Sequence, residues 1–208
     1  MAHAIATVLA LIVSWLSGSI PTAFIVTRAA TGKDIRTLGS GNAGATNVFR
    51  ALGARYAIPV FLVDFLKGFI PVFAILRGGF AFAVPETVLA LIAGAAAIAG
   101  HLFPPFIGWR GGKGVATGAG VVTALYPPLF PACLVVFASV FLVSKRTSLA
   151  SISTAAAVPF LYAAIATISG DGINFPLLSF LTLIAAIVIA RHRRNIARLA
   201  KGTEERLF

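Results

Sequence analysis

The chain has 208 residues, of which 59% are hydrophobic and only 11% are charged, and its mean hydropathy is +0.97. A soluble domain must cover its core with polar residues, so this composition excludes an ordinary soluble fold and indicates an integral membrane protein. The net charge of +11 would suggest nucleic acid in a soluble protein, but here the cations follow the loops expected between membrane helices, and no nucleic-acid partner is expected. The single cysteine, Cys133, excludes an intrachain disulfide.

Apolar runs near the roughly 20 residues that cross about 30 Å of hydrocarbon predict an all-α polytopic protein. The first run covers 5–26 and is interrupted near its end by Gly18 and Pro21. It has neither a basic start nor a cleavage context, so we expect it to be a retained helix rather than a signal peptide. The second run covers 56–76 and the third covers 88–103.

The second run carries two charges, Asp64 and Lys67, three residues apart on one face of the expected helix. Each charge alone costs roughly 2.5–3.5 kcal/mol at the bilayer centre on insertion scales. We therefore expect the pair to face the bundle interior, and we favour a structural ion pair over direct contact with a ligand.

The apolar stretch 115–143 is long for one crossing and short for two, and prolines break its middle. Basic residues flank both ends, and cytoplasmic loops collect Lys and Arg, so both ends should lie inside. The stretch should form two short helices, or a re-entrant pair, that turn near 126–128. The runs 149–168 and 175–190 complete the map.

This map predicts a seven-helix bundle with its N-terminus outside, its C-terminus in the cytoplasm and a short middle pair of helices. All seventeen Lys and Arg residues except Lys67 and Arg77 then lie on the cytoplasmic side. No linker, repeat or low-complexity segment divides the chain, so we expect a single integral-membrane domain over 1–208.

Four polar segments collect on that side: the first is 33–50, the second 108–117, the third 144–148 and the fourth 191–204. Their glycines let backbone N–H groups approach a ligand, their hydroxyls and carboxamides supply hydrogen bonds, and their cations suit phosphate. The alternative is that the cations only set topology and hold lipid heads, which explains Arg193 but not the glycines and amides. We expect one phosphate-binding pocket built from all four segments.

Two nucleotide-binding motifs are rejected. Gly39, Gly41 and Gly44 match G-x-G-x-x-G, but that fingerprint needs a preceding strand, and here it lies between membrane helices. The run 108–114 is one residue short of a P-loop and has Gly114 where Ser or Thr must bind magnesium. What remains is glycine-rich backbone suited to an anion. Neither a metal nor a cofactor is expected.

Three blocks resemble the signature blocks of a known family: Ser40 to Asn47 with Arg50, Gly100 to Pro104 leading into Gly111 to Thr117, and His192 to Ile196 with Arg198 and Glu204. The family is that of the bacterial acyl-phosphate-dependent glycerol-3-phosphate acyltransferases, the PlsY family. Trp109 and Arg110 depart from a more usual Phe-Lys pair but keep its aromatic and cationic character. The likeness extends from residues 18–22 to the C-terminal tail.

The resemblance implies transfer of a fatty acyl group from acyl phosphate to the 1-hydroxyl of sn-glycerol 3-phosphate, which yields lysophosphatidic acid and phosphate. This is the first committed step of bacterial phospholipid synthesis. It also implies a multi-pass enzyme of the bacterial cytoplasmic (inner) membrane, with membrane lipids around it and its active site on the cytoplasmic side. The residues leave the oligomeric state open, and a monomer is compatible with them.

By this likeness and by their chemistry, the expected catalytic residues are Ser40, Asn42, Arg50, Lys113, His192 and Asn195. The residues expected to bind substrate phosphate are Gly41, Gly44, Thr46, Asn47, Gly111, Gly112, Gly114, Thr117, Lys145 and Ser148. Glu204 is expected to be structural.

Acyl phosphate is already activated, so positioning and charge stabilisation can supply most of the rate. We expect direct attack by the glycerol hydroxyl, with Lys113 stabilising the leaving phosphate and either His192 or a substrate phosphate oxygen taking the proton. A covalent route through Ser40 is the rival, although no base stands at a diagnostic spacing.

A small transporter for an organophosphate is the alternative from a different functional class. Transporters commonly show inverted repeats with a site at the middle of the membrane, whereas this sequence shows no repeat and its polar segments are all expected on one side. A non-catalytic lipid-head binder would leave the glycine blocks unexplained.

Overall fold

The structure, a computed structural model, describes residues 1–207, and every regular element in that range is a helix. The chain packs into two compact units, Met1–Leu125 and Tyr126–Phe208. The expected all-helical class is confirmed. The expectation that the two units act as one domain stays a prediction.

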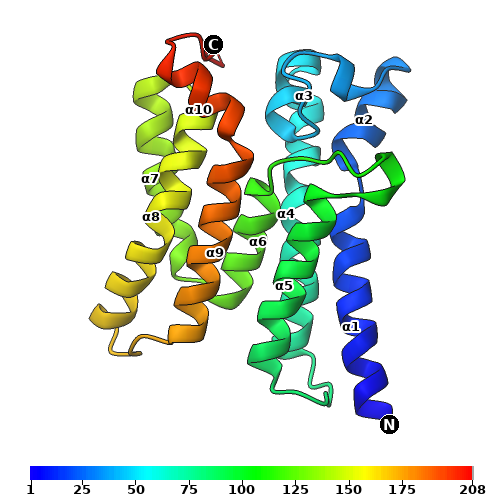
Figure 1. Cartoon of the computed structure of the whole chain (residues 1–208), viewed down its shortest axis with the longest axis vertical. Helices are drawn as coiled ribbons and strands as arrows, with labels where there is room; N and C mark the ends of the chain where they lie inside the picture. Colours follow the sequence, from blue (N-terminus) through cyan, green and yellow to red (C-terminus); the bar gives the residue numbers. More distant parts are fainter. Residues whose placement is uncertain (208) are drawn as a thin grey trace. The chain divides into compact units, whose positions relative to one another are not determined.

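Four helices form the bundle of the first unit: α1 (Ala2–Ser19), α4 (Ala54–Arg77), α5 (Glu86–Leu102) and the shorter α6 (Val115–Leu125). The helix α4 packs against the other three, and α1 packs against α5. Within this unit α1 and α5 run away from the end that holds the N-terminus, and α4 and α6 run back toward it (Figure 1). The loops before α4 and before α6 therefore lie at the same end of the unit.

Short helices occupy that end: α2 (Thr22–Thr31), the 3₁₀ helix η1 (Ile35–Thr37), α3 (Ala45–Leu52) and the 3₁₀ helix η2 (Pro105–Ile107). The first polar segment, 33–50, was expected to contain no helix, but η1 lies within it and the eight residues of α3 begin within it. The fully buried Val48 of α3 shares a small apolar core with Ile35 of η1 and Val60 of α4. Burial of this one apolar face stabilises a helix that is too short to be stable alone.

Small residues bring the helices of the first unit close together. A Cβ atom at Gly68 would collide with the backbone of Thr117, and one at Gly120 would collide with the α4 backbone. Gly18 and Gly100 allow the same close approach between α1 and α5. Such contacts are the main source of packing energy between helices in lipid, where apolar side chains gain little from leaving the solvent.

The break between α1 and α2 is held by a charged residue of α4. Pro21 has no N–H to continue the helix, and the ammonium of Lys67 donates to the carbonyl oxygen of Ile20 at 2.9 Å. The same ammonium lies 2.8 Å from a carboxylate oxygen of Asp64. Both charged side chains are only 3% exposed. The predicted buried ion pair is confirmed, and the structure adds the carbonyl that Lys67 holds.

The second unit contains α7 (Leu129–Ser144), α8 (Thr147–Ile168), α9 (Phe175–Arg191) and α10 (Arg193–Ala200). The helix α8 packs against both α7 and α9, as antiparallel neighbours in Figure 1. Lys145 joins α7 to α8 in the left-handed backbone region, and α10 leaves α9 at an angle of 60°.

Four helical stretches of residues 1–207 are long and apolar enough to span a membrane, or five if the bent pair α9–α10 counts as one span. The helices α6 and α7 are apolar but have only 11 and 16 residues. At 1.5 Å per residue α6 covers about 16 Å, roughly half of a hydrocarbon core. The short middle pair and its turn near Tyr126 agree with the prediction. Seven crossings and their orientation stay predictions.

Replacing Lys67 by Met should destabilise the first unit, because it leaves the Asp64 carboxylate buried without its cation. Breaking a buried pair in this way typically costs about 3–5 kcal/mol. We expect the purified Lys67→Met protein in detergent to melt at a lower temperature than the parent. The double variant Asp64→Leu, Lys67→Met removes both charges and should recover most of that loss. A Lys67→Met protein that melts with the parent would contradict a stabilising ion pair.

Candidate active site

The loop before α3 is folded around the side chain of Asn47. The carboxamide nitrogen of Asn47 donates to the carbonyl oxygens of Ile35 (3.1 Å) and Leu38 (2.9 Å), and its oxygen accepts from the backbone N–H of Ser40 at 2.9 Å. Gly39 has a φ of 50°, and a Cβ there would collide with this carboxamide. Asn47 is 1% exposed. These contacts give Asn47 a role in shaping the loop, and its expected contact with phosphate stays a prediction.

This loop and α3 present the polar groups of the first polar segment. Ser40 and Gly41 are exposed, whereas Asn42, Thr46 and Arg50 are partly buried. Gly44 precedes the first residue of α3. The segment thus offers a hydroxyl, amides and a guanidinium at one end of the first unit, a combination that suits a phosphate group.

The second polar segment turns back onto the end of α5. The backbone N–H groups of Gly111 and Gly112 donate to carbonyl oxygens in the last turn of α5 at 3.1 and 3.2 Å. These two N–H groups are therefore already used, and the two glycines anchor the turn. The chain continues through Lys113 and Gly114 into the first turn of α6, whose backbone N–H groups have no acceptor within the helix. A helix start of this kind suits an anion.

Arg36 ties the first polar segment to the loop that leads into the second. Its guanidinium donates to the carbonyl oxygen of Ile107 and forms an ion pair with Asp34 at 2.6 Å. The hydrogen bonds from Arg36 hold the pKa of the Asp34 carboxyl below its usual value. The first two polar segments themselves also meet within the first unit, since a Cβ atom at Gly112 would collide with the carbonyl oxygen of Ala43.

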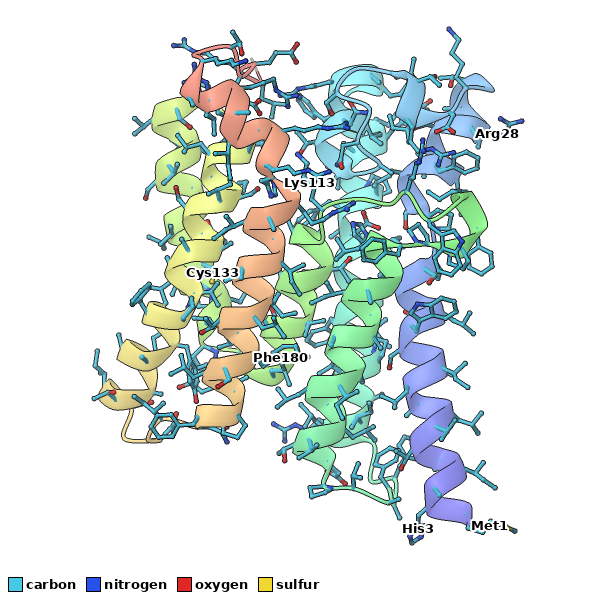
Figure 2. All side chains as sticks on the ribbon, in the orientation of Figure 1. Met1, His3, Arg28, Lys113, Cys133 and Phe180 are labelled. Atoms are coloured by element: carbon cyan, nitrogen blue, oxygen red, sulfur yellow. The ribbon has the colours of Figure 1, made fainter. Side chains whose placement is uncertain are left out.

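Within the first unit, Lys113 and Arg28 lie toward the end that holds the polar loops, and Met1 and His3 lie at the opposite end (Figure 2). The side chain of Lys113 is partly buried. A small pocket opens near this turn. It is lined by Gly18, Ile20, Pro21, Thr22, Ala43, Asp64, Lys67, His101, Pro104, Ile107, Gly111 and Gly112.

Thr117 does not join these loops. It is fully buried where the α6 backbone meets Gly68 of α4, and among residues 1–207 its hydroxyl oxygen has no hydrogen-bond partner. This position favours a packing role, and its expected contact with phosphate stays a prediction.

The second unit gathers its polar residues around the carboxylate of Glu204. Ser148 and Asn195 each donate to one carboxylate oxygen at 2.6 Å, and Arg198 donates to the other at 2.6 Å. The backbone of the tail is held as well, because Arg146 donates to the carbonyl of Glu204 at 3.0 Å. The third and fourth polar segments therefore meet within this unit, and Glu204 has the structural role expected of it. That all four polar segments form one pocket stays a prediction.

The contacts of this unit also limit what its residues can do. The hydroxyl proton of Ser148 is committed to Glu204, so in this arrangement Ser148 cannot donate it to phosphate. The carbonyl of Lys145 accepts from the backbone N–H of Leu207 at 2.8 Å, which fixes the backbone from which the Lys145 side chain extends. Direct contact of Ser148 and Lys145 with phosphate stays a prediction.

His192 is 2% exposed and lies at the junction of α9 and α10. Its Nδ1 atom is 2.7 Å from the carbonyl oxygen of Val188. A carbonyl only accepts, so Nδ1 carries the proton, and the neutral ring then has its lone pair on Nε2. In that tautomer Nε2 is the nitrogen that can accept a proton.

Two residues that shape the site received no role from the sequence. The sequence shows Arg36 only as one cation of the first polar segment, and His101 only as part of the block Gly100 to Pro104. The spacing of Asp34 and Arg36 and the position of His101 at the end of a helix were the available signals. Among residues 1–207, no group of three or more His, Cys, Asp or Glu side chains is placed to hold a metal ion.

The fold and these loops define an integral-membrane helical protein with glycine-rich, cationic segments at helix ends. A family model described as glycerol-3-phosphate acyltransferase matches residues 8–202. The chain belongs to this family, which confirms the resemblance drawn from the three sequence blocks.

Relatives and solved structures agree with this assignment. The glycerol-3-phosphate acyltransferase of Geotalea daltonii is 44% identical over 92% of this chain and 92% of its own, and that of Aquifex aeolicus is 42% identical over 94% and 96%. The crystal structure of PlsY (YgiH), an integral membrane glycerol 3-phosphate acyltransferase, is similar in its glycerol 3-phosphate form, with a TM-score of 0.84 and 37% identity. Its lysophosphatidic acid form gives 0.81 and 35%. Both matches cover 97% of this chain and 95% of the other.

The Glu204 contacts predict a pH dependence of stability. Burial raises the pKa of the Glu204 carboxyl, but hydrogen bonds from Ser148, Arg198 and Asn195 outweigh it, so the pKa lies below its usual 4.5. A carboxyl whose pKa is lowered by folding stabilises the folded state fully above its unfolded-state pKa, and this stabilisation is lost as the pH falls through the folded-state value.

We therefore expect Glu204→Gln to lower the melting temperature at neutral pH, with a difference from the parent that shrinks progressively below pH 4.5. Melting curves of both proteins across this range measure the effect. Glu205→Gln, at the exposed neighbouring position, is the matched control. A difference between parent and Glu204→Gln that does not change with pH would contradict the ionised Glu204 network.

Proposed function

We propose that this chain is a glycerol-3-phosphate 1-O-acyltransferase that moves a fatty acyl group from acyl phosphate to sn-glycerol 3-phosphate. The products are lysophosphatidic acid and inorganic phosphate. The proposal is supported by membership of the family over residues 8–202 and by likeness to an acyltransferase solved in glycerol 3-phosphate and lysophosphatidic acid forms. Family membership gives no support to the alternative of an organophosphate transporter.

The observation that carries the proposal is the meeting of the first two polar segments at one end of the first unit. The anchored turn at Gly111 and Gly112 leads through Lys113 into a helix start, and the loop folded by Asn47 lies beside it. Both proposed substrates carry phosphate, and cations with helix-end N–H groups bind phosphate. Substrate phosphate is the ligand for which this combination is suited.

By likeness to the family and by their chemistry, we assign the reaction to Ser40, Asn42, Arg50, Lys113, His192 and Asn195. The glycerol oxygen attacks the acyl carbonyl carbon, the bond from that carbon to the phosphate oxygen breaks, and phosphate leaves. Lys113 stabilises the charge on the departing phosphate. The hydroxyl proton passes to Nε2 of His192 or to a phosphate oxygen of the substrate.

Direct attack is favoured over an acyl-enzyme by the surroundings of Ser40. Within the described part of the chain, the hydroxyl of Ser40 has no hydrogen bond to a histidine or carboxylate that could activate it. In His192, Nε2 is the nitrogen that can accept a proton, and a backbone carbonyl rather than a carboxylate holds the Nδ1–H. Detection of an acyl group on Ser40 after incubation with acyl phosphate alone would contradict the direct route.

We also propose that the protein resides in the bacterial cytoplasmic membrane as a single functional domain, with seven crossings and a cytoplasmic active site. The distribution of Lys and Arg along the chain supports this orientation. A monomer suffices for the proposed chemistry, since all the assigned residues belong to one chain.

The orientation can be tested with reporters fused after Ala83, in the loop between α4 and α5, and after Leu207. We expect the Ala83 fusion to report the outer side and the Leu207 fusion the cytoplasm, because Lys and Arg are retained inside. Reporters at Asn42 and Asn195 should both report the cytoplasm. Placement of these two positions on opposite sides would contradict the proposed orientation.

The activity can be tested with purified protein, radiolabelled sn-glycerol 3-phosphate and palmitoyl phosphate. We expect labelled lysophosphatidic acid, and none when palmitoyl-CoA or palmitoyl acyl carrier protein replaces the acyl phosphate. Lys113→Ala should lose about 100-fold or more in turnover, as removal of a group that stabilises transition-state charge does. Arg28→Ala removes an exposed cation of the same unit and is the control. No product with any donor, or near-parental turnover of Lys113→Ala, would contradict the respective assignment.

A further inference from the structure

Three ionisable side chains lie buried together inside the first unit and have no assigned part in the reaction. The side chains of Asp64 and Lys67 are each 3% exposed and that of His101 is 7% exposed. The Nδ1 atom of His101 is 3.9 Å from the same Asp64 oxygen that pairs with Lys67. Buried polar groups in a membrane helix are costly and commonly serve function. The ion pair alone explains two of the three residues, which leaves the histidine to be explained.

His101 holds Gly112 in two ways. Its backbone carbonyl accepts the N–H of Gly112 at 3.2 Å. Its ring lies against the Cα of Gly112, since a Cβ built there would collide with Nε2 and Cε1 of the ring. The same Cβ would also collide with the carbonyl oxygen of Ala43. Gly112 is therefore enclosed between the imidazole of α5 and the first polar segment.

The imidazole thus sets how closely the first two polar segments approach. On its Nδ1 side the ring faces the Asp64 carboxylate, which is fixed by Lys67, and Lys67 in turn is fixed on the carbonyl of Ile20. On its Nε2 side it meets the glycine turn. The chain of contacts runs from the break in α1 to the turn that precedes α6, and each member of it lines the same pocket.

We propose that His101, backed by the Asp64–Lys67 ion pair, is a positioning residue for the binding of sn-glycerol 3-phosphate. The ring supports Gly112 and so fixes the distance between the glycine turn and the loop that carries Ser40 and Asn42. The imidazole does not touch the reacting atoms, so its loss weakens substrate binding and leaves the chemical step largely intact. This inference rests on the proposed function for the identity of the ligand.

Two substitutions at His101 distinguish two roles of its ring: support of Gly112 through the Nε2 side and contact with Asp64 through the Nδ1 side. Asparagine places its amide near the position of Nδ1 but is too short to reach Gly112, whereas glutamine reaches as far as Nε2. A substitution that weakens binding of the substrate and of the transition state equally raises KM and leaves kcat unchanged. We expect His101→Asn to raise the KM for sn-glycerol 3-phosphate by about tenfold or more with kcat little changed, and His101→Gln to retain most of the affinity.

The matched control is His3→Asn, the same substitution at an exposed histidine at the other end of α1 (Figure 2). Its KM should equal that of the parent. Asp64→Asn keeps the shape of the side chain but removes the charge behind the ring, and it should raise the same KM. Melting curves and size-exclusion profiles report whether each variant is folded, and His101→Gln, which leaves the Asp64–Lys67 pair intact, keeps the proposal testable if His101→Asn does not fold.

Binding of sn-glycerol 3-phosphate without any acyl donor, measured by the ligand-induced rise in melting temperature, supplies a readout that does not need turnover. If the parent binds this ligand but forms no product, the proposed function fails while the comparison of His101 variants still stands. Weaker binding by His101→Asn than by His101→Gln supports the proposal. Equal KM and binding for parent and His101→Asn, a loss confined to kcat, or equal losses in both variants would overturn it.

Discussion

The first unit depends on neutralising one ammonium group inside a membrane helix. Lys67 cannot remain charged in an apolar interior without partners, and it finds a carboxylate one turn away and a backbone carbonyl on another helix. That carbonyl belongs to Ile20, at the break between α1 and α2, where it also accepts the N–H of Thr22 at 3.0 Å. The ammonium of Lys67 therefore neutralises the Asp64 carboxylate and binds the carbonyl of Ile20 at the helix break. These contacts hold the chain at the point where it leaves α1.

The small apolar core that follows this break lies beneath the polar loops. After the break, α2 leads to η1, whose Ile35 packs with Val48 of α3 and Ile107 of η2. Arg36 closes the arrangement from outside by donating to the carbonyl of Ile107. The glycine-rich segments are flexible as sequences, but here they lie on a packed base and are fixed at several points. A phosphate site gains from such order because less entropy is lost when the ligand binds.

The sequence predicted the class, the apolar runs, the buried ion pair and the polar segments, because each depends on composition or on spacing within one stretch. It missed α3, since glycines flank this helix and its single apolar face is recognised only beside Ile35 and Val60. It also could not show which polar groups are already used. Asn47, Gly112 and Ser148 have the chemistry of phosphate ligands, yet donors of all three are bonded within the protein. Partners far away in the chain decide this, and a single sequence does not name them.

The two tryptophans of the chain, Trp15 and Trp109, lie in one contact, with ring centroids 6.5 Å apart. One ring belongs to α1 and the other to the loop between η2 and the glycine turn, where Trp109 has a φ of 63°. Fluorescence excited at the red edge of the indole absorption band therefore comes only from Trp109 in this loop and from Trp15 beside it. The native protein carries its own optical reporter of how its second polar segment sits on α1, with no need of an attached dye.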